Sequence, residues 1–317
     1  MISGLPFDDF RHLVTNVGGA DEAARTEAAA VNRHAAERDG PAGEAALISE
    51  WLAAWSGRRP GPLKPQIAIF AGTHDLAQHL PADTETVQAF VERCGTGGAA
   101  INQLCAAGDY GLKVFDLALD VPVGDFTVEA ALDERGCAAT MAFGMEAIAG
   151  ANGLVVLAGH GGRSGSLSAR TLLEALKMPV ADTSPAESAL QAAALSHHDV
   201  HLADPLEALR RLGGREIAAL AGAILAARTQ KVPVLLDGIS ALAAAATLHA
   251  LNREAVAHCM VADGAGAFGR IARALGLQSV IQLGMQTSDA AAGAIAAGVV
   301  QAAAFCHAAA GASLRRR

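Results

Sequence analysis

The sequence predicts an α/β protein: a doubly wound, Rossmann-like parallel sheet with a small helical appendage formed by both ends of the chain. Two observations support this prediction. Short apolar runs alternate with longer helical patterns through the middle of the chain, which is typical of βαβ units with right-handed crossovers. The first 60 residues show helical patterns without such strand-like runs. We therefore expect a helical region at 1–60, joined by the C-terminal segment 290–312, and an α/β domain at 61–289.

The predicted elements follow one another in a regular order. The candidate strands are Ile67–Phe70, Lys113–Leu119, Leu154–Leu157, Val232–Leu236, His258–Val261 and Ser279–Leu283. The expected helices are Val87–Ala107, Asp133–Ala149, Arg215–Arg228, Ser240–Leu251, Phe268–Leu275 and a terminal helix from Ala290. Because single helices separate short strands, the sheet should be parallel, with helices on both faces.

Composition limits the classes of function. The 317 residues are 52% hydrophobic but only 4% aromatic, and 34 are glycine, so helices should pack closely through small side chains. A net charge of −8 argues against a nucleic-acid surface, and we expect Arg315–Arg317 to be a solvated tail. The five cysteines form no CxxC pair and no signal peptide is recognisable, which favours a reducing cytoplasm. The segment 290–312 is long enough to span a membrane, but because it is mostly Ala and Gly we expect a buried helix.

Ligands of open parallel sheets bind beyond the carboxyl ends of the strands, so the loops after the strands are the candidate site. The most suggestive loop is rich in glycine and hydroxyl groups and carries one arginine. Backbone N–H groups at a helix N-terminus together with such side chains can hold a phosphate. The alternative is an ordinary connection in which a serine caps the next helix. The residues concerned are Gly161, Gly162, Arg163, Ser164, Gly165 and Ser166.

Other loops offer single polar groups. Asp237 and Gly238 end a strongly apolar strand, and the carboxylate could accept ribose hydroxyls or cap the following helix. His74 and His160 follow neighbouring candidate strands and could face one another. The histidines of 197–201 have no metal-ligand spacing, so a solvated polar loop is expected there and no metal site is predicted.

Several motifs carry a resemblance to a known family. Gly213-Gly214-Arg215-Glu216-Ile217-Ala218, Val232-Pro233-Val234-Leu235-Leu236-Asp237-Gly238, Phe70-Ala71-Gly72-Thr73-His74 and Gly97-Gly98-Ala99-Ala100-Ile101-Asn102-Gln103-Leu104 resemble segments of nicotinate-nucleotide–dimethylbenzimidazole phosphoribosyltransferases. The resemblance runs from about Gly4 to the C-terminus. It implies a pentosyltransferase of cobalamin lower-ligand assembly, a homodimer without a cofactor. The substrates would be nicotinate mononucleotide and an aromatic base such as dimethylbenzimidazole.

The resemblance also implies roles for residues. Counting back from the terminal helix places Asp289 at the family's general base, a glutamate in a Leu-Gly-Glu-Gly-Ser-Gly run, within the segment Leu283–Gly293. The turn 161–166, with Gly213, Gly214, Asp237 and Gly238, would bind the nucleotide. The aromatic base would lie in a cleft with His74, Gln88 and His160.

The family's reactive segments differ here from the usual pattern, which leaves three hypotheses open. One difference is Asp289 in place of the family's glutamate. In addition, the nucleotide loop lacks the family's other glutamate, and a lysine of the family is replaced near Gln191. The family's Gly-His-x-Ser-x-Glu loop corresponds here to Val261–Gly266. The family's N-terminal Lys-Pro-x-Gly-Ser-Leu-Gly motif also changes, at residues 38–44. The chain could be an active phosphoribosyltransferase with altered substrate preference. It could instead be an impaired member that binds or regulates, or that pairs with an active paralogue in a heterodimer. A different enzyme on the same scaffold is the third hypothesis.

Overall fold

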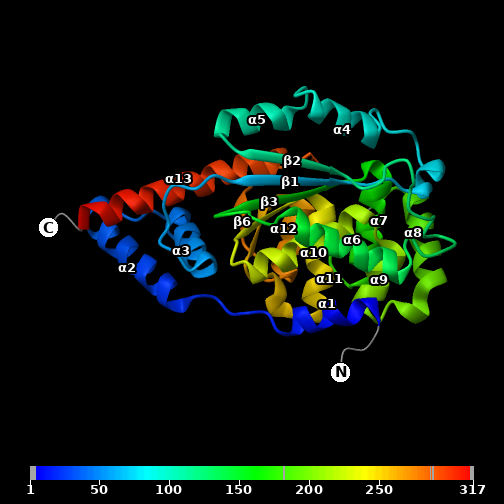
Figure 1. Ribbon diagram of the computed structural model, residues 1–317, viewed down its shortest axis with the longest axis horizontal. Coiled ribbons are helices and arrows are strands. Elements are labelled where there is room, and N and C mark those ends of the chain that lie inside the picture. Colours follow the sequence, from blue (N-terminus) through cyan, green and yellow to red (C-terminus); the bar gives the residue numbers. More distant parts are fainter. Residues whose placement is uncertain (1–4, 181–182, 286, 288, 315–317) are drawn as a thin grey trace.

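Six parallel strands form one sheet in the order β2-β1-β3-β4-β5-β6 (Figure 1). The computed structural model describes residues 5–180, 183–285, 287 and 289–314. The doubly wound parallel sheet predicted from the sequence is confirmed, and the order reverses between β1 and β3, which makes this the switch point of the sheet. The strands are β1 Gln66–Ala71, β2 Gly111–Asp116, β3 Val155–His160, β4 Val234–Asp237, β5 Cys259–Asp263 and β6 Ser279–Ile281.

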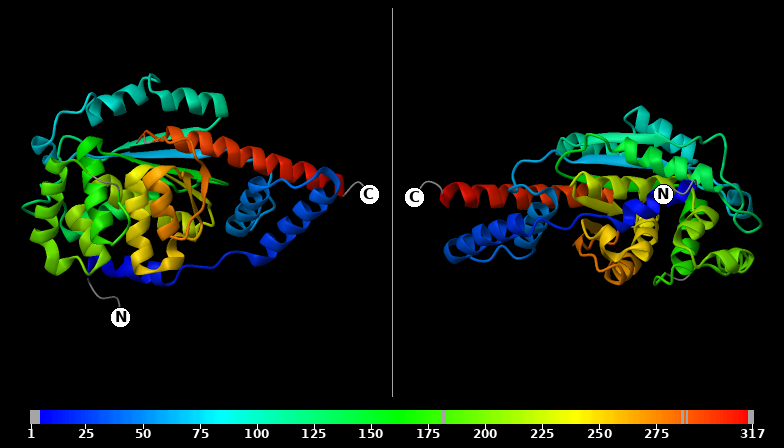
Figure 2. Two further views of the ribbon diagram at one scale, coloured as in Figure 1. Left: turned by 180° about the vertical axis from the view of Figure 1, so that it is seen from behind. Right: turned by 60° about the horizontal axis from the view of Figure 1, so that its bottom comes forward.

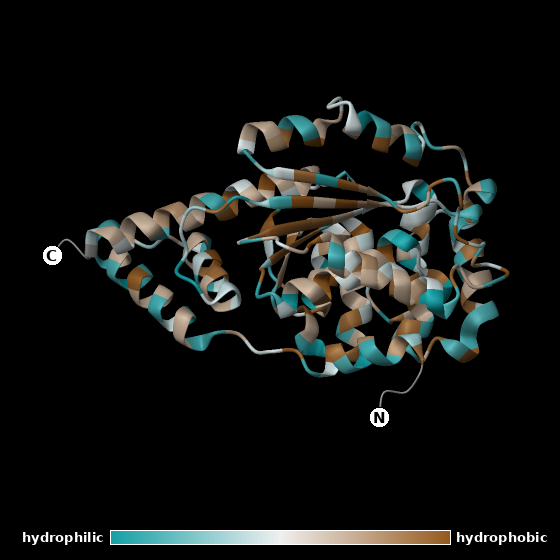
Figure 3. Ribbon diagram, viewed as in Figure 1, coloured by the Kyte–Doolittle hydropathy of each residue, from teal (hydrophilic) through white to brown (hydrophobic). Residues whose placement is uncertain are grey.

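Both faces of the sheet are buried, because alternate side chains enter different core clusters. Ala68 and Phe70 of β1 belong to one cluster, whereas Ile67 and Ile69 belong to the other. Hydropathy follows this burial, since β3 is mostly hydrophobic while the peripheral helix α8 Pro185–His198 carries more hydrophilic residues (Figure 3). The cluster of Phe70 is completed by α6 Glu134–Ala147, α7 Gly162–Ala175, α9 Pro205–Leu212, α10 Arg215–Thr229, α11 Gly238–Leu251 and α12 Gly266–Ala274. The opposite cluster includes α4 Val87–Gly95, α5 Ala100–Gly108 and α13 Ala291–Leu314.

Small residues bring α6 and α10 into close contact, as the composition suggested. A methyl group added at Gly222 would overlap the carbonyl oxygen of Met141, and one at Gly144 would overlap that of Ala219. The two helix backbones therefore touch at these positions, and the glycines are required for the packing.

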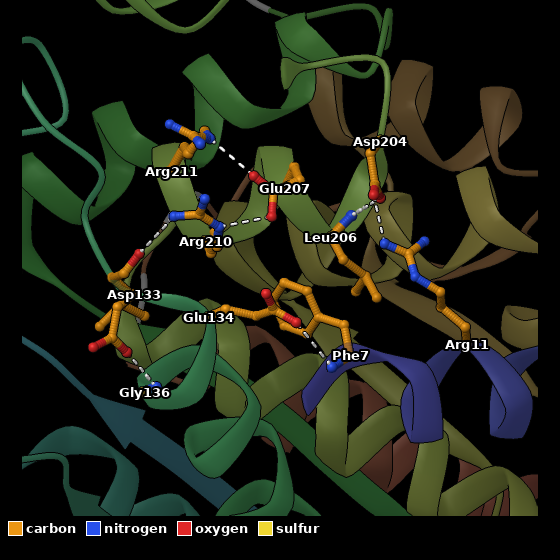
Figure 4. A network of polar contacts seen from close by, with 11 residues as sticks. Phe7, Arg11, Asp133, Glu134, Gly136, Asp204, Leu206, Glu207, Arg210 and Arg211 are labelled. Carbon is orange, nitrogen blue, oxygen red and sulfur yellow. Dashed lines mark hydrogen bonds and ion pairs between the residues drawn. The ribbon is translucent and has the colours of Figure 1, made fainter. Parts of the chain in front are cut away.

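The helical region consists of α2 Glu22–Asp39 and α3 Glu44–Ser56, which lie beside the C-terminal half of α13 and project away from the sheet (Figures 1 and 2). The first helix, α1 Pro6–Thr15, falls within residues 1–60 but packs against α6 and α11 instead. The Phe7 N–H donates to Glu134, and Arg11 forms an ion pair with Asp204 at 2.5 Å (Figure 4).

Three expectations need correction. The helix predicted over Val87–Ala107 is two helices, α4 and α5, because Gly97 has a positive φ of 79° that ends the first one. The second strand, expected at Lys113–Leu119, spans Gly111–Asp116. His198, expected in a solvated loop, is buried in α8 Pro185–His198, where its Nε2 lies 2.9 Å from the carbonyl oxygen of Phe126. Short 3₁₀ turns occupy Asp75–His79, Asp199–His201 and Arg253–Val256.

The terminal helix α13 is a core element. By length and composition alone, Ala291–Ser313 could cross a membrane, but 56% of its most apolar window is buried inside the protein. Its first half packs on β3, β4 and β5, and its second half packs on α3 and α2. This agrees with the buried, alanine-rich helix expected from the sequence.

Candidate active site

The loops that follow β1 and β3 meet at the switch point of the sheet. Ala71 and His160 are in register at the ends of these strands, and the Gly72 N–H donates to the His160 carbonyl at 3.1 Å. His74 follows β1 directly, and α7 begins at Gly162, two residues after the end of β3. The predicted phosphate-binding turn therefore lies where ligands of doubly wound sheets bind.

The first turn of α7 already holds a carboxylate of the protein. The Arg163 N–H donates to the Asp83 oxygens at 3.1 and 3.3 Å, and Arg163 Nε lies 3.9 Å from Asp83 Oδ1. Gly162 has φ +61°, and an added methyl group would overlap Asp83 Oδ2, so only glycine lets the carboxylate approach. The Ser164 and Ser166 hydroxyls donate back to the carbonyls of Gly161 and Gly162. This helix N-terminus thus holds an anionic group, the carboxylate of Asp83, whereas the phosphate binding expected from the sequence stays a prediction.

A buried ion pair lies directly behind this turn. His74 Nε2 is 2.9 Å from Glu216 Oε1, and neither side chain has any exposed surface. Complete burial opposes the charged carboxylate, but the charge and the hydrogen bond of His74 hold the pKa of Glu216 below its ordinary value, with a smaller contribution from His160. His74 is therefore beneath the surface of the site.

Gly213 and Gly214 are needed for packing at the start of α10. A methyl group at Gly213 would approach the Leu209 carbonyl oxygen to 2.5 Å, and one at Gly214 would overlap both Glu216 and His74. Gly214 therefore gives the backbone room to pass the buried pair, whereas Gly213 gives it room at the end of α9.

Helix α4 provides the aromatic part of the site. The ring of Phe90 stacks on His160 with 3.9 Å between centroids, and Arg93 lies 5.7 Å from the Phe90 centroid. The Arg93 guanidinium forms an ion pair with Glu85 at 2.5 Å. Gln88 is exposed on the same helix.

Three carboxyl groups surround the N-terminal turn of α13. Asp237 Oδ2 accepts the Gly293 N–H at 2.6 Å and makes no capping bond to its own helix α11. Burial, together with repulsion from Asp289 and Asp263, raises the pKa of Asp237 to about 7. Asp289 accepts the Ala291 N–H at 3.1 Å.

Asp263 organises the loop after β6. Its carboxylate accepts from the N–H groups of Ala265 at 2.9 Å, Leu283 at 3.2 Å and Met285 at 2.7 Å. Gln286 and Ser288 of the segment compared with the family's base, and the terminal arginines 315–317, lie outside the described residues.

Sequence reasoning did not identify Glu216, Asp83 or Phe90 as site residues. A signal for Glu216 was present, because it is a carboxylate in a helix whose neighbours are almost all apolar. The sequence carries no such signal for Asp83, because it lies 80 residues from Arg163 in an ordinary polar loop.

Comparison with known proteins identifies the class. Residues 17–313 match a family model described as phosphoribosyltransferase. The chain is 48% identical over 322 residues to the nicotinate-nucleotide–dimethylbenzimidazole phosphoribosyltransferase of Agrobacterium fabrum, covering 96% of this chain and 93% of that protein. It is 46% identical over 328 residues to the enzyme of the same name from Sinorhizobium fredii, covering 96% and 95%.

A solved structure shows the same fold. The crystal structure of the nicotinate-nucleotide–dimethylbenzimidazole phosphoribosyltransferase from Thermus thermophilus superposes with a TM-score of 0.77 at 22% identity, covering 88% of this chain and 94% of that one. The family model, which covers nearly the whole chain, shows a protein of the phosphoribosyltransferase class. More specifically, the chain belongs to the nicotinate-nucleotide–dimethylbenzimidazole phosphoribosyltransferase family.

Proposed function

We propose that the chain transfers phosphoribose from nicotinate mononucleotide to an aromatic azole such as 5,6-dimethylbenzimidazole, forming an α-ribazole phosphate for the lower ligand of cobalamin. The observation that carries this proposal is the anion-holding first turn of α7 at the switch point, in a chain that belongs to this family over nearly its whole length. A nucleotide phosphate has the charge and the acceptor oxygens that this turn accommodates.

In the proposed complex the phosphate takes the place of the Asp83 carboxylate. The Arg163 N–H, now bonded to Asp83, would donate to a phosphate oxygen, and the Arg163 guanidinium would add a charge-assisted contact. Asp83 is in a loop and its side chain is partly exposed, so it can move into solvent without disturbing the core. The glycines of the turn leave room for the phosphate oxygens.

The azole would lie against the partly exposed ring of His160, which stacks on the buried Phe90, and near Gln88 of α4. A flat apolar ring next to this stack gains dispersion and offset-stacking energy of about 1 kcal/mol beyond its buried area. The partly exposed position of His160 places the stack at the edge of the site, where a ligand can reach it.

Asp289 is proposed as the general base. The azole nitrogen attacks C1′ of the ribose, the C1′–nitrogen bond to nicotinate breaks, and nicotinate leaves with the bonding electron pair. The N–H proton of the azole passes to the Asp289 carboxylate. Asp237, whose pKa is raised to about 7 by burial, would contact a ribose hydroxyl.

The test measures nicotinate release and α-ribazole phosphate formation from nicotinate mononucleotide and dimethylbenzimidazole. We expect turnover in the wild type and its loss in Asp289→Asn. Nucleotide binding without turnover in the wild type would contradict the proposed reaction.

A second proposal is that the chain binds ligand without turnover, as a regulator or as a partner of an active paralogue. The observation that favours it is Asp83, which occupies the turn that an active enzyme would offer to its substrate. Copurification with a paralogue, and turnover only in the mixture, would support it. The homodimer and the cytoplasmic location remain predictions, and sedimentation analysis of the purified chain would test the former.

A further inference from the structure

We propose that Glu216 and His74 are positioning residues for nucleotide binding. The buried pair they form sets the position of the phosphate-binding turn Gly161–Ser166 through direct glycine contacts. The identity of the ligand rests on the proposed function, whereas the contacts between the pair and the turn are features of the structure itself.

Folding stability alone does not account for this pair. His74 Nδ1 and Glu216 Oε2 are buried and make no hydrogen bond within the described part of the chain. Removing two charged groups from water costs more than an incompletely bonded pair regains, and well-packed apolar residues at such places are often neutral or stabilising. A buried pair with two unmade hydrogen bonds therefore indicates a role beyond stability.

The pair is enclosed by glycines from three separate loops. A methyl group at Gly72, after β1, would approach Glu216 Oε2 to 2.6 Å, and one at Gly161, after β3, would approach Glu216 Oε1 to 2.8 Å. At Gly165 the corresponding distance to Oε1 is 3.0 Å, and at Gly214 the methyl group would overlap both members of the pair. The backbone of each loop thus rests directly on the charged atoms, with no side chain between them.

Two of these glycines belong to the phosphate-binding turn. Gly161 precedes α7, and Gly165 lies in the first turn of that helix. The Gly165 N–H donates a hydrogen bond to the Gly161 carbonyl at 2.8 Å. A shift of Glu216 or His74 would therefore move the Arg163 N–H, which donates to Asp83 on the outer side of the same turn. Misplacement of a binding group by about 1 Å can cost about 100-fold, so shifts of a few tenths of an ångström are measurable.

The charges of the pair also suit an anion site. Glu216 alone would repel a phosphate bound on the outer side of the turn. His74 and, more weakly, His160 oppose its charge, as the lowered pKa of Glu216 indicates. An uncharged side chain of the same shape at position 216 would weaken the attraction to His74, and the glycine backbone that lies against the pair would shift with it.

The test is Glu216→Gln, which keeps the shape of the side chain and one hydrogen bond to His74. We expect the KM for nicotinate mononucleotide to rise about tenfold, with the KM for the azole and kcat each within about threefold of the wild type. The matched control is Glu207→Gln on α9, which removes the ion pairs to Arg210 and Arg211 (Figure 4) and leaves the His74–Glu216 pair intact. It should lower the melting temperature without changing the KM for the nucleotide.

A second variant keeps the inference testable if Glu216→Gln fails to fold. Gly165→Ala leaves the pair intact but pushes the turn away from it, and it should reproduce the higher KM. Unchanged KM values in the folded variants, or an equal rise in the KM of both substrates, would overturn the inference.

Direct binding separates this inference from the proposed reaction. Calorimetry with nicotinate mononucleotide, and with inorganic phosphate, measures affinity even if the wild type does not turn over. A wild type that binds either probe about tenfold more tightly than Glu216→Gln supports the positioning role even when the proposed reaction fails. Equal affinity overturns the positioning role, and absence of binding to the wild type overturns both.

Discussion

Replacing Asp237 by Asn should change how the stability of the protein depends on pH. Asp237 is buried at the end of β4, and its pKa is raised from 3.8 to about 7, chiefly by burial. A folded state with the higher pKa binds the proton more tightly than the unfolded chain does. The stability contributed by the protonated group is therefore fully present below about pH 4, and it is lost as the pH rises through about 7.

The magnitude follows from the two pKa values. Between pH 5 and the folded pKa of about 7, the carboxyl is ionised in the unfolded chain but still protonated in the folded protein. Over this range the free energy of unfolding falls by about 2.7 kcal/mol, at about 1.36 kcal/mol per pH unit. Asn has the same shape and can still accept the Gly293 N–H, which now bonds to Asp237 Oδ2 at 2.6 Å, but it does not titrate. Relative to Asp237→Asn, the wild type should therefore lose roughly 2.5 kcal/mol of unfolding free energy between pH 5 and pH 8.

Urea denaturation of both proteins at pH 5, 6, 7 and 8 measures this difference. Asp289→Asn is an informative companion, because removing the repulsion from Asp289 should lower the pKa of Asp237 and move the loss of stability to lower pH. The reasoning is refuted if the wild type and Asp237→Asn differ by the same amount at pH 5 and pH 8, or if the wild type gains stability over that range.

Three further predictions follow from the packing and the site. Asp289→Asn should reduce turnover at least about 100-fold while nucleotide binding by calorimetry stays within threefold, because only proton removal is lost. Gly222→Ala should lower the free energy of unfolding, measured by urea denaturation, by about 3 kcal/mol, because the new methyl group overlaps the backbone of Met141. The control Gly19→Ala, which has open space around it, should change this free energy by less than about 0.5 kcal/mol. A bulky thiol reagent should label one cysteine per native chain, because Cys306 is exposed and the other four are buried, and Cys306→Ser should abolish this labelling.

The sheet could be predicted from the sequence because its strands are buried on both faces. Runs such as Ile67–Phe70 and Val232–Leu236 are continuously apolar, and a glycine or an aspartate follows within two residues. The position of these strands along the chain can therefore be predicted without tertiary information. Strand boundaries were less accurate on the edge strand β2, whose residues are only partly buried and whose pattern is correspondingly weak. The break between α4 and α5 depended on the backbone angle of Gly97, which composition alone does not determine.

The candidate site could be predicted only where one segment contains the whole feature. The turn Gly161–Ser166 carries its glycines and hydroxyls in six consecutive residues, so it could be identified from the sequence as a candidate anion-binding turn. The pair of His74 and Glu216 joins residues 142 apart, and neither residue type in its local sequence indicates the other. The same holds for Asp83 and Arg163, whose contact arises from folding alone.

The two carboxylates that contact the first turn of α7 act on it in different ways. Glu216 lies on the inner side, has no exposed surface and is fixed by His74, so it cannot leave without unfolding the switch point. Asp83 lies on the outer side in a loop, and its polar partner within the described part of the chain is Arg163. Because the inner carboxylate is hydrogen-bonded to His74 inside the core, exchange of the outer one for another anion would leave this buried pair intact. In the proposed complex, binding at this turn would therefore be an exchange of one anion for another, and its affinity would depend on how much better a phosphate fits the turn than Asp83 does.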